Sequence, residues 1–211
     1  MESTLRGSVP AGTRLIETFG WTPDAGYARL ERHLARMAKS AGQMGFGFDA
    51  AAARRCLSAD GSQPLRCRLT LGADGFEFTA AIVAATPKSW AVSISDQRLF
   101  SGDPWLQHKT TRRELYDTVR ADLPGGIDES LFLNENNQVC EGTITNIFVT
   151  LADGTQVTPP TDCGLLPGIL REELLESGQC KEALVTLDML YSAKAIHMGN
   201  SLRGLIPVTL A

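Results

Sequence analysis

The N-terminal part of the chain switches from a helical to a strand-like hydrophobic pattern, so its fold must pack helix against sheet. Residues 26–41 place apolar side chains at spacings of four, three and four, the stripe of an amphipathic helix that we expect Gly42 and Gly45 to end. Two runs of β-forming residues, 65–71 and 76–83, are then separated by a short turn bounded by glycines, which predicts a hairpin. The apolar positions of the helix are Leu30, Leu34, Met37 and Ala41.

A second helix and a linker complete this first part of the chain. Asp49 can cap a short helix that continues through a run of alanines to Cys56. The segment 85–89 contains a proline between two strand-like runs and is the best linker candidate. We therefore predict a small N-terminal domain at residues 1–86 and a larger domain at residues 90–211, with a mixed α+β architecture. In the larger domain we expect strands at 90–94, 129–133 and 145–149 and helices at 110–121 and 169–176.

The composition is that of a globular protein and excludes several classes of function. Of the 211 residues 43% are hydrophobic, and 24 acidic against 20 basic side chains give a formal net charge of −4. Because no basic stripe is available to neutralise phosphates, nucleic acid is not expected to be the main partner. The chain has no run of about 18 apolar residues and no N-terminal signal core, so we expect a cytoplasmic protein that does not bind membranes. The five cysteines form no C-x-x-C pair, so we expect reduced, mostly buried thiols and no metal site.

Lys109 is the first candidate for chemistry. It lies in the sequence HKTTRR at residues 108–113, among cations and hydroxyl groups. Neighbouring positive charges can depress the pKa of an amine and favour its neutral, nucleophilic form. By itself this pattern is more typical of a solvated lysine, so a catalytic role needs support from elsewhere in the chain.

That support comes from the sequence CEGTITNIFV at residues 140–149, which is followed by a threonine and by LLPGILR at residues 165–171. In this order and spacing these residues resemble the signature of the class IV family of pyridoxal-phosphate enzymes, which includes branched-chain and D-amino-acid aminotransferases and aminodeoxychorismate lyases. The separation of Lys109 from Glu141 is also similar to that between the lysine and the glutamate of this family. One position departs from the pattern, because Gln156 stands where an apolar residue is usual. The matching positions are Glu141, Thr143, Asn146, Ile147, Phe148, Thr158, Leu166, Gly168, Ile169 and Arg171.

The resemblance implies a pyridoxal 5'-phosphate cofactor and assigns roles to residues of this chain. Lys109 would form a Schiff base with the cofactor and then act as the general base. Glu141 would stabilise the protonated ring nitrogen, which makes the ring a better electron sink. Leu166 would pack on the ring face, and the amides of Ile169 and Leu170 at a helix start would hold the phosphate. Without the resemblance, Glu141 would be interpreted as a surface acid and the helix start as an ordinary turn.

Three further residues are assigned by the same resemblance. Ser201 matches a hydroxyl ligand of the phosphate late in the family's sequence. Arg36 matches the arginine that pairs with the phosphate from the small domain, a bidentate contact that suits arginine, although an arginine on a helix can also be simply solvated. We interpret His33, three residues before Arg36, as structural. Thr18 aligns with a threonine linked to proton handling in the lyase branch, so Lys109 and Thr18 are the expected catalytic residues.

The resemblance also implies the architecture and a homodimer. We expect an α+β, two-domain class IV aminotransferase-like fold with a shortened N-terminal α/β sandwich domain and a larger C-terminal β-barrel-like domain. Family members usually carry an additional pair of strands before the segment that 15–18 resembles. Here that segment lies close to the start of the sequence, so we expect a short N-terminal domain. The family's arginine for the substrate carboxylate is replaced here by Leu71, which counts against an ordinary D-amino-acid aminotransferase unless another arginine takes that role. The candidates are Arg66, Arg68 and Arg203.

Two segments favour one reaction within the family. Residues 108–117 and 200–204 look like the short lyase-type domains that are fused to a component of aminodeoxychorismate synthase. We therefore interpret the chain as a lyase that converts 4-amino-4-deoxychorismate to 4-aminobenzoate and pyruvate. Two alternatives stay open: a branched-chain or D-amino-acid aminotransferase, which needs an oxo acid to restore its cofactor, and a non-catalytic cofactor-binding or interaction protein.

Overall fold

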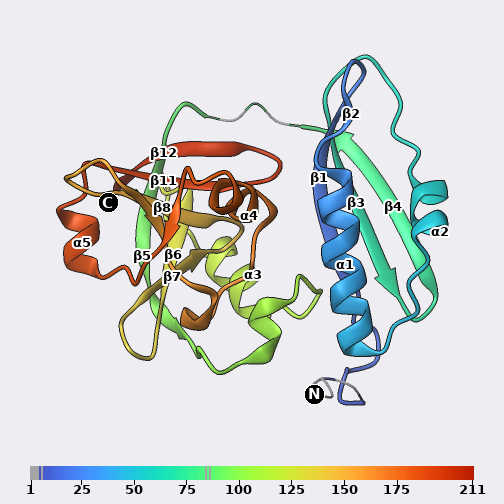
Figure 1. Cartoon of the computed structure of the whole chain (residues 1–211), viewed down its shortest axis with the longest axis horizontal. Helices are drawn as coiled ribbons and strands as arrows, with labels where there is room; N and C mark the ends of the chain where they lie inside the picture. Colours follow the sequence, from blue (N-terminus) through green and yellow to red (C-terminus); the bar gives the residue numbers. More distant parts are fainter. Residues whose placement is uncertain (1–4, 6, 84, 86) are drawn as a thin grey trace. The chain divides into compact units, whose positions relative to one another are not determined.

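The computed structural model describes all residues of the chain except 1–4, 6, 84 and 86. The described residues form two compact units (Figure 1). The N-terminal unit comprises the chain up to residue 85 together with 108–112, and the C-terminal unit comprises 86–107 and 113–211. Thr86, part of the expected linker, lies outside the described residues, and the domain boundary between residues 86 and 90 stays a proposal.

The N-terminal unit is built on a four-stranded sheet with the order β2-β1-β3-β4 and antiparallel pairing throughout. Its strands are β1 (Leu15–Thr22), β2 (Gly26–Tyr27), β3 (Leu65–Gly72) and β4 (Gly75–Ile82). The predicted hairpin is confirmed as β3 and β4, with Gly72 paired to Gly75 across the turn. Gly75 has a φ of 103°, a backbone conformation that residues other than glycine rarely adopt, so this tight turn depends on Gly75.

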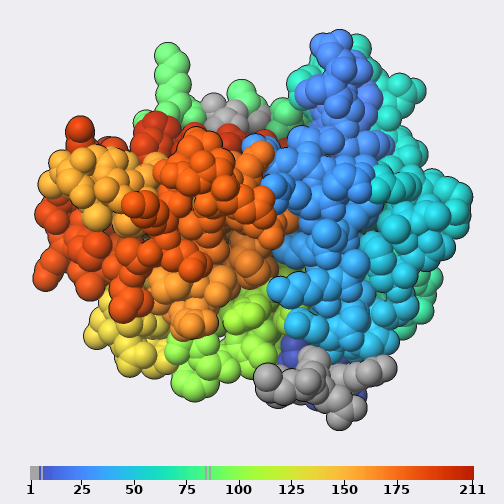
Figure 2. Space-filling view, viewed as in Figure 1, coloured from blue at the N-terminus to red at the C-terminus, as the bar shows by residue number. Residues whose placement is uncertain are grey.

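Two helices accompany this sheet. The expectation that Gly42 ends the first helix is wrong, because α1 (Leu30–Met44) runs through it and ends at Gly45, whose φ of 78° allows a left-handed cap. A glycine inside a helix costs only about 1 kcal/mol, which the buried face of α1 outweighs. α2 (Ala50–Cys56) begins after Asp49, whose carboxylate accepts a hydrogen bond from an N–H of the first turn, as predicted. In the space-filling view the atoms of α1 and α2, in blue and cyan, form a continuous outer surface (Figure 2).

The register of the sheet decides which side chains meet the helices. Glu17 and Phe19 of β1 contact His33 of α1, so these alternate positions face the helix. Thr18 therefore lies on the opposite face, where the register makes Arg68 of β3 its cross-strand neighbour. The face under α1 is thus mostly apolar but also carries Glu17, and the opposite face carries Thr18 and Arg68.

The C-terminal unit is a closed barrel of six strands in the order β8-β11-β12-β5-β6-β7, with β7 pairing back to β8. The pairs β12–β5 and β5–β6 are parallel and the others antiparallel, which makes the barrel mixed. The barrel strands are β5 (Trp90–Leu99), β6 (Glu129–Asn134), β7 (Val139–Gly142), β8 (Asn146–Thr150), β11 (Ala195–Asn200) and β12 (Gly204–Leu210). Two short strands, β9 (Gln156–Thr158) and β10 (Lys181–Glu182), continue the sheet from β8.

Three α-helices belong to the C-terminal unit, namely α3 (Glu114–Ala121), α4 (Ile169–Glu176) and α5 (Leu187–Tyr191). The helix expected at 110–121 begins only at Glu114. The reason is that Thr110 forms a bridge with Leu15, and the N–H of Thr111 donates to the carbonyl of Arg14, so this backbone is extended beside β1. The helix expected at 169–176 is confirmed with both of its ends.

Two expectations from composition concern the whole chain. No helix within the described part of the chain is long and apolar enough to cross a membrane. The five cysteines are free thiols, and all but Cys56 are buried. Burial raises the pKa of Cys67 to about 11, so its thiol is a poor nucleophile at neutral pH.

Candidate active site

Glu141 lies near the end of β7 and is 6% exposed. Two neighbours hold its carboxylate. The hydroxyl of Tyr116, on α3, donates to Oε1 at 2.8 Å, and Nδ2 of Asn146, at the start of β8, donates to Oε2 at 3.3 Å. Because both carboxylate oxygens are bonded, the side chain has a fixed orientation in a largely dry environment.

Asn146 connects this carboxylate to the start of α4. Its Nδ2 also donates to the carbonyl of Leu166 at 3.0 Å. A Cβ atom at Gly168 would lie 1.9 Å from Oδ1 of Asn146, so only glycine fits at this position. The sequence signature therefore places Glu141, Leu166 and the beginning of α4 around one asparagine.

The start of α4 has the features of an anion site. Gly168 precedes the helix and has no side chain that could cap it. The amides of the first turn, including those of Ile169 and Leu170, therefore donate no hydrogen bond to a side chain at the capping position. A Cβ atom at Gly199 would lie 2.9 Å from Cδ2 of Leu170, which shows that the end of β11 packs closely on this helix. Ser201 follows that strand directly and is 9% exposed.

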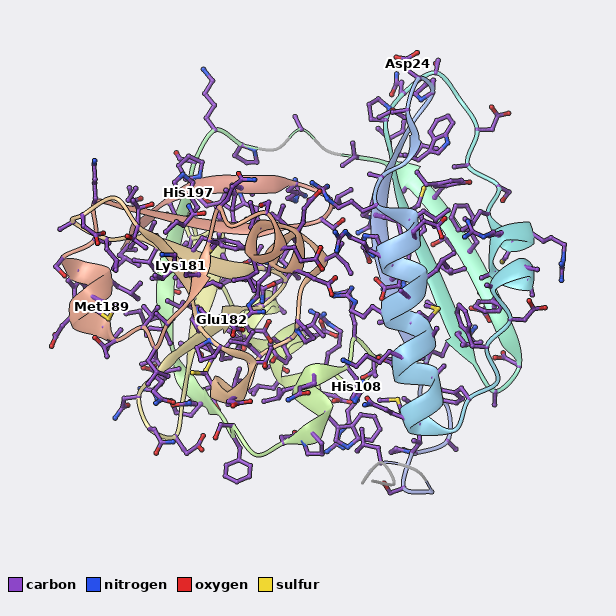
Figure 3. The ribbon with its side chains drawn as sticks, viewed as in Figure 1. Asp24, His108, Lys181, Glu182, Met189 and His197 are labelled. Carbon is purple, nitrogen blue, oxygen red and sulfur yellow. The ribbon has the colours of Figure 1, made fainter. Side chains whose placement is uncertain are left out.

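Lys109 belongs to the N-terminal unit, while its position in the sequence lies within residues 90–211, the range proposed for the larger domain. Its carbonyl accepts a hydrogen bond of 2.8 Å from the N–H of Ile16, which fixes the backbone of Lys109 beside β1. Thr18 lies two residues further along the same strand and is half-buried. Next to Lys109 on the chain, His108 has its Nδ1 at 2.9 Å from Oγ of Ser40 on α1 (Figure 3).

Arg36 is part of a buried cluster in the N-terminal unit. Its Nε and Nη2 donate to the two carboxylate oxygens of Glu17 at 2.9 and 2.7 Å, and Nδ1 of His33 lies 2.6 Å from Oε2 of Glu17. Burial raises the pKa of Glu17, but the charge of Arg36 and the hydrogen bonds from His33 and Arg36 outweigh it, so the pKa is lowered overall. Burial lowers the pKa of His33 despite the bond to Glu17, and the charge of Lys109 adds to this lowering.

The family model described as "Amino-transferase class IV" matches residues 14–211. The match covers nearly the whole chain, both of its compact units included. The chain belongs to the class IV aminotransferase family. This match confirms the family that the sequence signature indicates. Class IV aminotransferases and their lyase relatives are pyridoxal-phosphate-dependent enzymes.

Individual class IV relatives include both reaction types. A "Probable branched-chain-amino-acid aminotransferase" from Thermotoga maritima is 27% identical over 98% of this chain and 78% of the relative. "Aminodeoxychorismate lyase" from Saccharomyces cerevisiae is 28% identical over 58% of this chain and 37% of the relative. A crystal structure from Mesorhizobium loti, named "Putative amino-acid aminotransferase", is 43% identical with a TM-score of 0.90, and the match covers 94% of this chain and 100% of that one. The predicted class IV fold is thereby confirmed.

Two residues of the class IV signature support the scaffold. The hydroxyl of Thr158 donates to the carbonyl of Ile147 at 2.8 Å and ties β9 to β8. Arg171 of α4 is 4% exposed, donates to the carbonyl of Pro159 at 2.8 Å and pairs with Glu182 on β10 (Figure 3). These contacts fix α4 relative to the strands that precede it.

The sequence does not indicate three side chains that support the candidate site, namely two buried glutamates and one tyrosine. Glu17 holds Arg36, Glu129 holds the turn between β7 and β8, and Tyr116 holds Glu141. Glu129 is fully buried, which is rare for an acid, and it pairs with Arg120 at 3.5 Å. Its position at the edge of an apolar run gives no signal of this role. Tyr116 lies in the lyase-like segment 108–117, but its contact with Glu141 joins residues 25 apart, so no local sequence pattern indicates it.

The lowered pKa of Glu17 predicts a pH-dependent stability. A carboxyl whose pKa is lower in the folded protein stabilises it above the ordinary value of 4.5, and this stabilisation is lost as the pH falls through the folded value. We expect Glu17→Gln to unfold about 3 kcal/mol more easily than the wild type at pH 7, because Arg36 loses a buried partner. The difference in unfolding free energy between Glu17→Gln and the wild type should narrow as the pH falls below 4.5.

Urea unfolding from pH 7 to pH 3 measures this gap. Glu31→Gln is the matched control, because Glu31 pairs with Arg54 on an exposed face of α1. Its difference from the wild type should be small at every pH. If the difference in unfolding free energy between Glu17→Gln and the wild type stays constant down to pH 3, the ionised carboxylate is not the form that stabilises the protein.

Proposed function

We propose that the chain is a pyridoxal 5'-phosphate-dependent lyase that converts 4-amino-4-deoxychorismate to 4-aminobenzoate and pyruvate. The observation that carries the cofactor assignment is the buried Glu141, whose two oxygens are fixed beside the start of α4. A fixed carboxylate can pair with a ring nitrogen, and an uncapped helix start can bind a phosphate, so these groups fit the cofactor. We also propose a homodimer, from the family resemblance, and a cytoplasmic location, from the hydropathy of the sequence.

Each proposed site residue has a chemical role that follows from its type and environment. Lys109 would hold the cofactor covalently and then take the proton from the amine-bearing ring carbon of the substrate. Glu141 would keep a proton on the ring nitrogen, and Leu166 would pack on the ring. The proposed phosphate ligands are the Ile169 and Leu170 amides, Ser201 and Arg36. When bound, the cofactor takes up the electron pair released at the substrate carbon.

The lyase reaction needs no second substrate. Removal of the ring proton and cleavage of the C–O bond to the enolpyruvyl group leave an aromatic product and release pyruvate. Thr18 is the proposed second group for proton handling. It shares a sheet face with Arg68, an arginine proposed to replace the missing substrate-carboxylate ligand at Leu71.

Two assays separate the lyase from an aminotransferase, the candidate that the relatives from Thermotoga maritima and Mesorhizobium loti favour. Protein loaded with pyridoxal phosphate is given 4-amino-4-deoxychorismate without any oxo acid, and pyruvate and 4-aminobenzoate are measured. The lyase predicts equal amounts of both products over many turnovers. No product, together with conversion of the cofactor to its amine form by a branched-chain or D-amino acid and recovery by an oxo acid, would establish the aminotransferase instead. A protein that takes up no cofactor would contradict both.

A further inference from the structure

The Tyr116 hydroxyl is held in place beside the carboxylate of Glu141. Tyr116 lies in the first turn of α3, and its ring packs edge-on against Phe132 with 5.2 Å between the ring centroids. The guanidinium of Arg113 lies 5.8 Å from the centroid of the same ring. With the ring held by these contacts, its hydroxyl reaches Oε1 of Glu141 at 2.8 Å.

The direction of this hydrogen bond is fixed by the charges around it. Burial raises the pKa of Tyr116 far above its ordinary value, and the neighbouring carboxylate of Glu141 raises it further. The phenol therefore stays protonated at neutral pH and donates, while the carboxylate accepts. A donated hydrogen bond stabilises the charged form of a carboxyl group, and the amide of Asn146 does the same at Oε2.

We propose that Tyr116 is a positioning residue that keeps Glu141 ionised and directed at the ring nitrogen of the cofactor. This inference rests on the proposed function. Without the phenol, the carboxylate has one fewer donor and becomes a stronger base. It then competes with the ring nitrogen for the shared proton, and the ring withdraws electrons less well.

Tyr116→Phe tests this inference with little change of shape, because it removes one hydroxyl and keeps the ring contact with Phe132. We expect kcat to fall about 10-fold with little change in KM, since a hydrogen bond to a charged group is worth about this factor. Tyr191→Phe is the matched control, because Tyr191 is 68% exposed on α5 of the same unit. It should behave as the wild type.

A spectroscopic readout separates positioning from a general structural role. The visible absorbance of the bound cofactor is followed against pH in each variant. The midpoint of this absorbance change reports the pKa of the linkage between the cofactor and Lys109. Less positive charge on the ring raises that pKa, so Tyr116→Phe should move the midpoint upward by about one pH unit. Tyr191→Phe should leave the midpoint in place.

A double-mutant cycle with Glu141→Gln completes the test. If Tyr116 acts through Glu141, adding Tyr116→Phe to Glu141→Gln should change neither kcat nor the midpoint further. Independent, additive losses would overturn the inference, and so would a Tyr116→Phe enzyme with wild-type kcat and midpoint while Glu141→Gln alters both. A wild-type protein that binds no cofactor would instead overturn the proposed function itself.

Discussion

Replacing Lys109 by alanine is expected to lower turnover by about 10³-fold or more while the protein stays folded. The change removes both the group proposed to hold the cofactor and the proposed general base, and such losses are large. Stability should be little affected, because the substitution keeps the backbone carbonyl of Lys109, which accepts the N–H of Ile16 and fixes this segment. Pyruvate release and thermal unfolding measure the two effects.

Lys181→Ala is the control for this substitution. Lys181 lies on β10 and is exposed, so it tests the loss of a lysine without the loss of the proposed site (Figure 3). Near wild-type turnover is expected for Lys181→Ala. Near wild-type turnover for Lys109→Ala would refute the catalytic assignment, and loss of the folded state would point to a structural role instead.

Glu129→Ala is expected to have the largest effect on stability, a loss of about 3 kcal/mol or more. Glu129 is fully buried, and its carboxylate accepts hydrogen bonds from the turn that joins β7 to β8. Removing it leaves several buried donors without an acceptor, and each such group costs about 1–3 kcal/mol. The donors are Ser130 N at 3.0 Å, Thr143 N at 2.9 Å, Thr143 Oγ1 at 2.5 Å, Ile144 N at 3.3 Å and Thr145 Oγ1 at 3.0 Å.

Urea unfolding of three variants measures this effect. Glu129→Gln keeps one acceptor oxygen and should lose less stability than Glu129→Ala. Glu135→Ala removes an exposed acid that accepts hydrogen bonds from Ser101 and Asn136, and it should change little. A loss below about 1 kcal/mol for Glu129→Ala would show that the turn does not depend on this carboxylate.

Sequence patterns predicted those helices and strands whose ends are fixed by residues nearby in the sequence. The hairpin of β3 and β4 follows from its glycine-bounded turn, and α4 follows from Pro167 and Gly168 before an apolar run. Asp49 caps α2 for the same local reason. The expected helical start at 110–113 is wrong, because the backbone of Thr110 and Thr111 pairs with Leu15 and Arg14, about a hundred residues away, which helical periodicity does not reveal.

The candidate site was predictable where the family signature concentrates residues. Glu141, Leu166 and the start of α4 belong to one run of sequence, and the structure joins them through Asn146. The supporting contacts were not predictable, because they depend on strand register and on the packing of helices far along the chain. Glu17 and Arg36 are 19 residues apart, and Glu129 and Thr145 are 16 apart.

The most direct test of the central claim is to find which lysine holds the cofactor. The protein is incubated with pyridoxal phosphate, treated with borohydride to make the linkage permanent, digested, and mapped by mass spectrometry. The account predicts a single modified peptide that carries the cofactor on Lys109, and Glu141→Gln should carry it there too. Modification at Lys39, Lys88, Lys181 or Lys194 with Lys109 unmodified, or no modification at all, would contradict it.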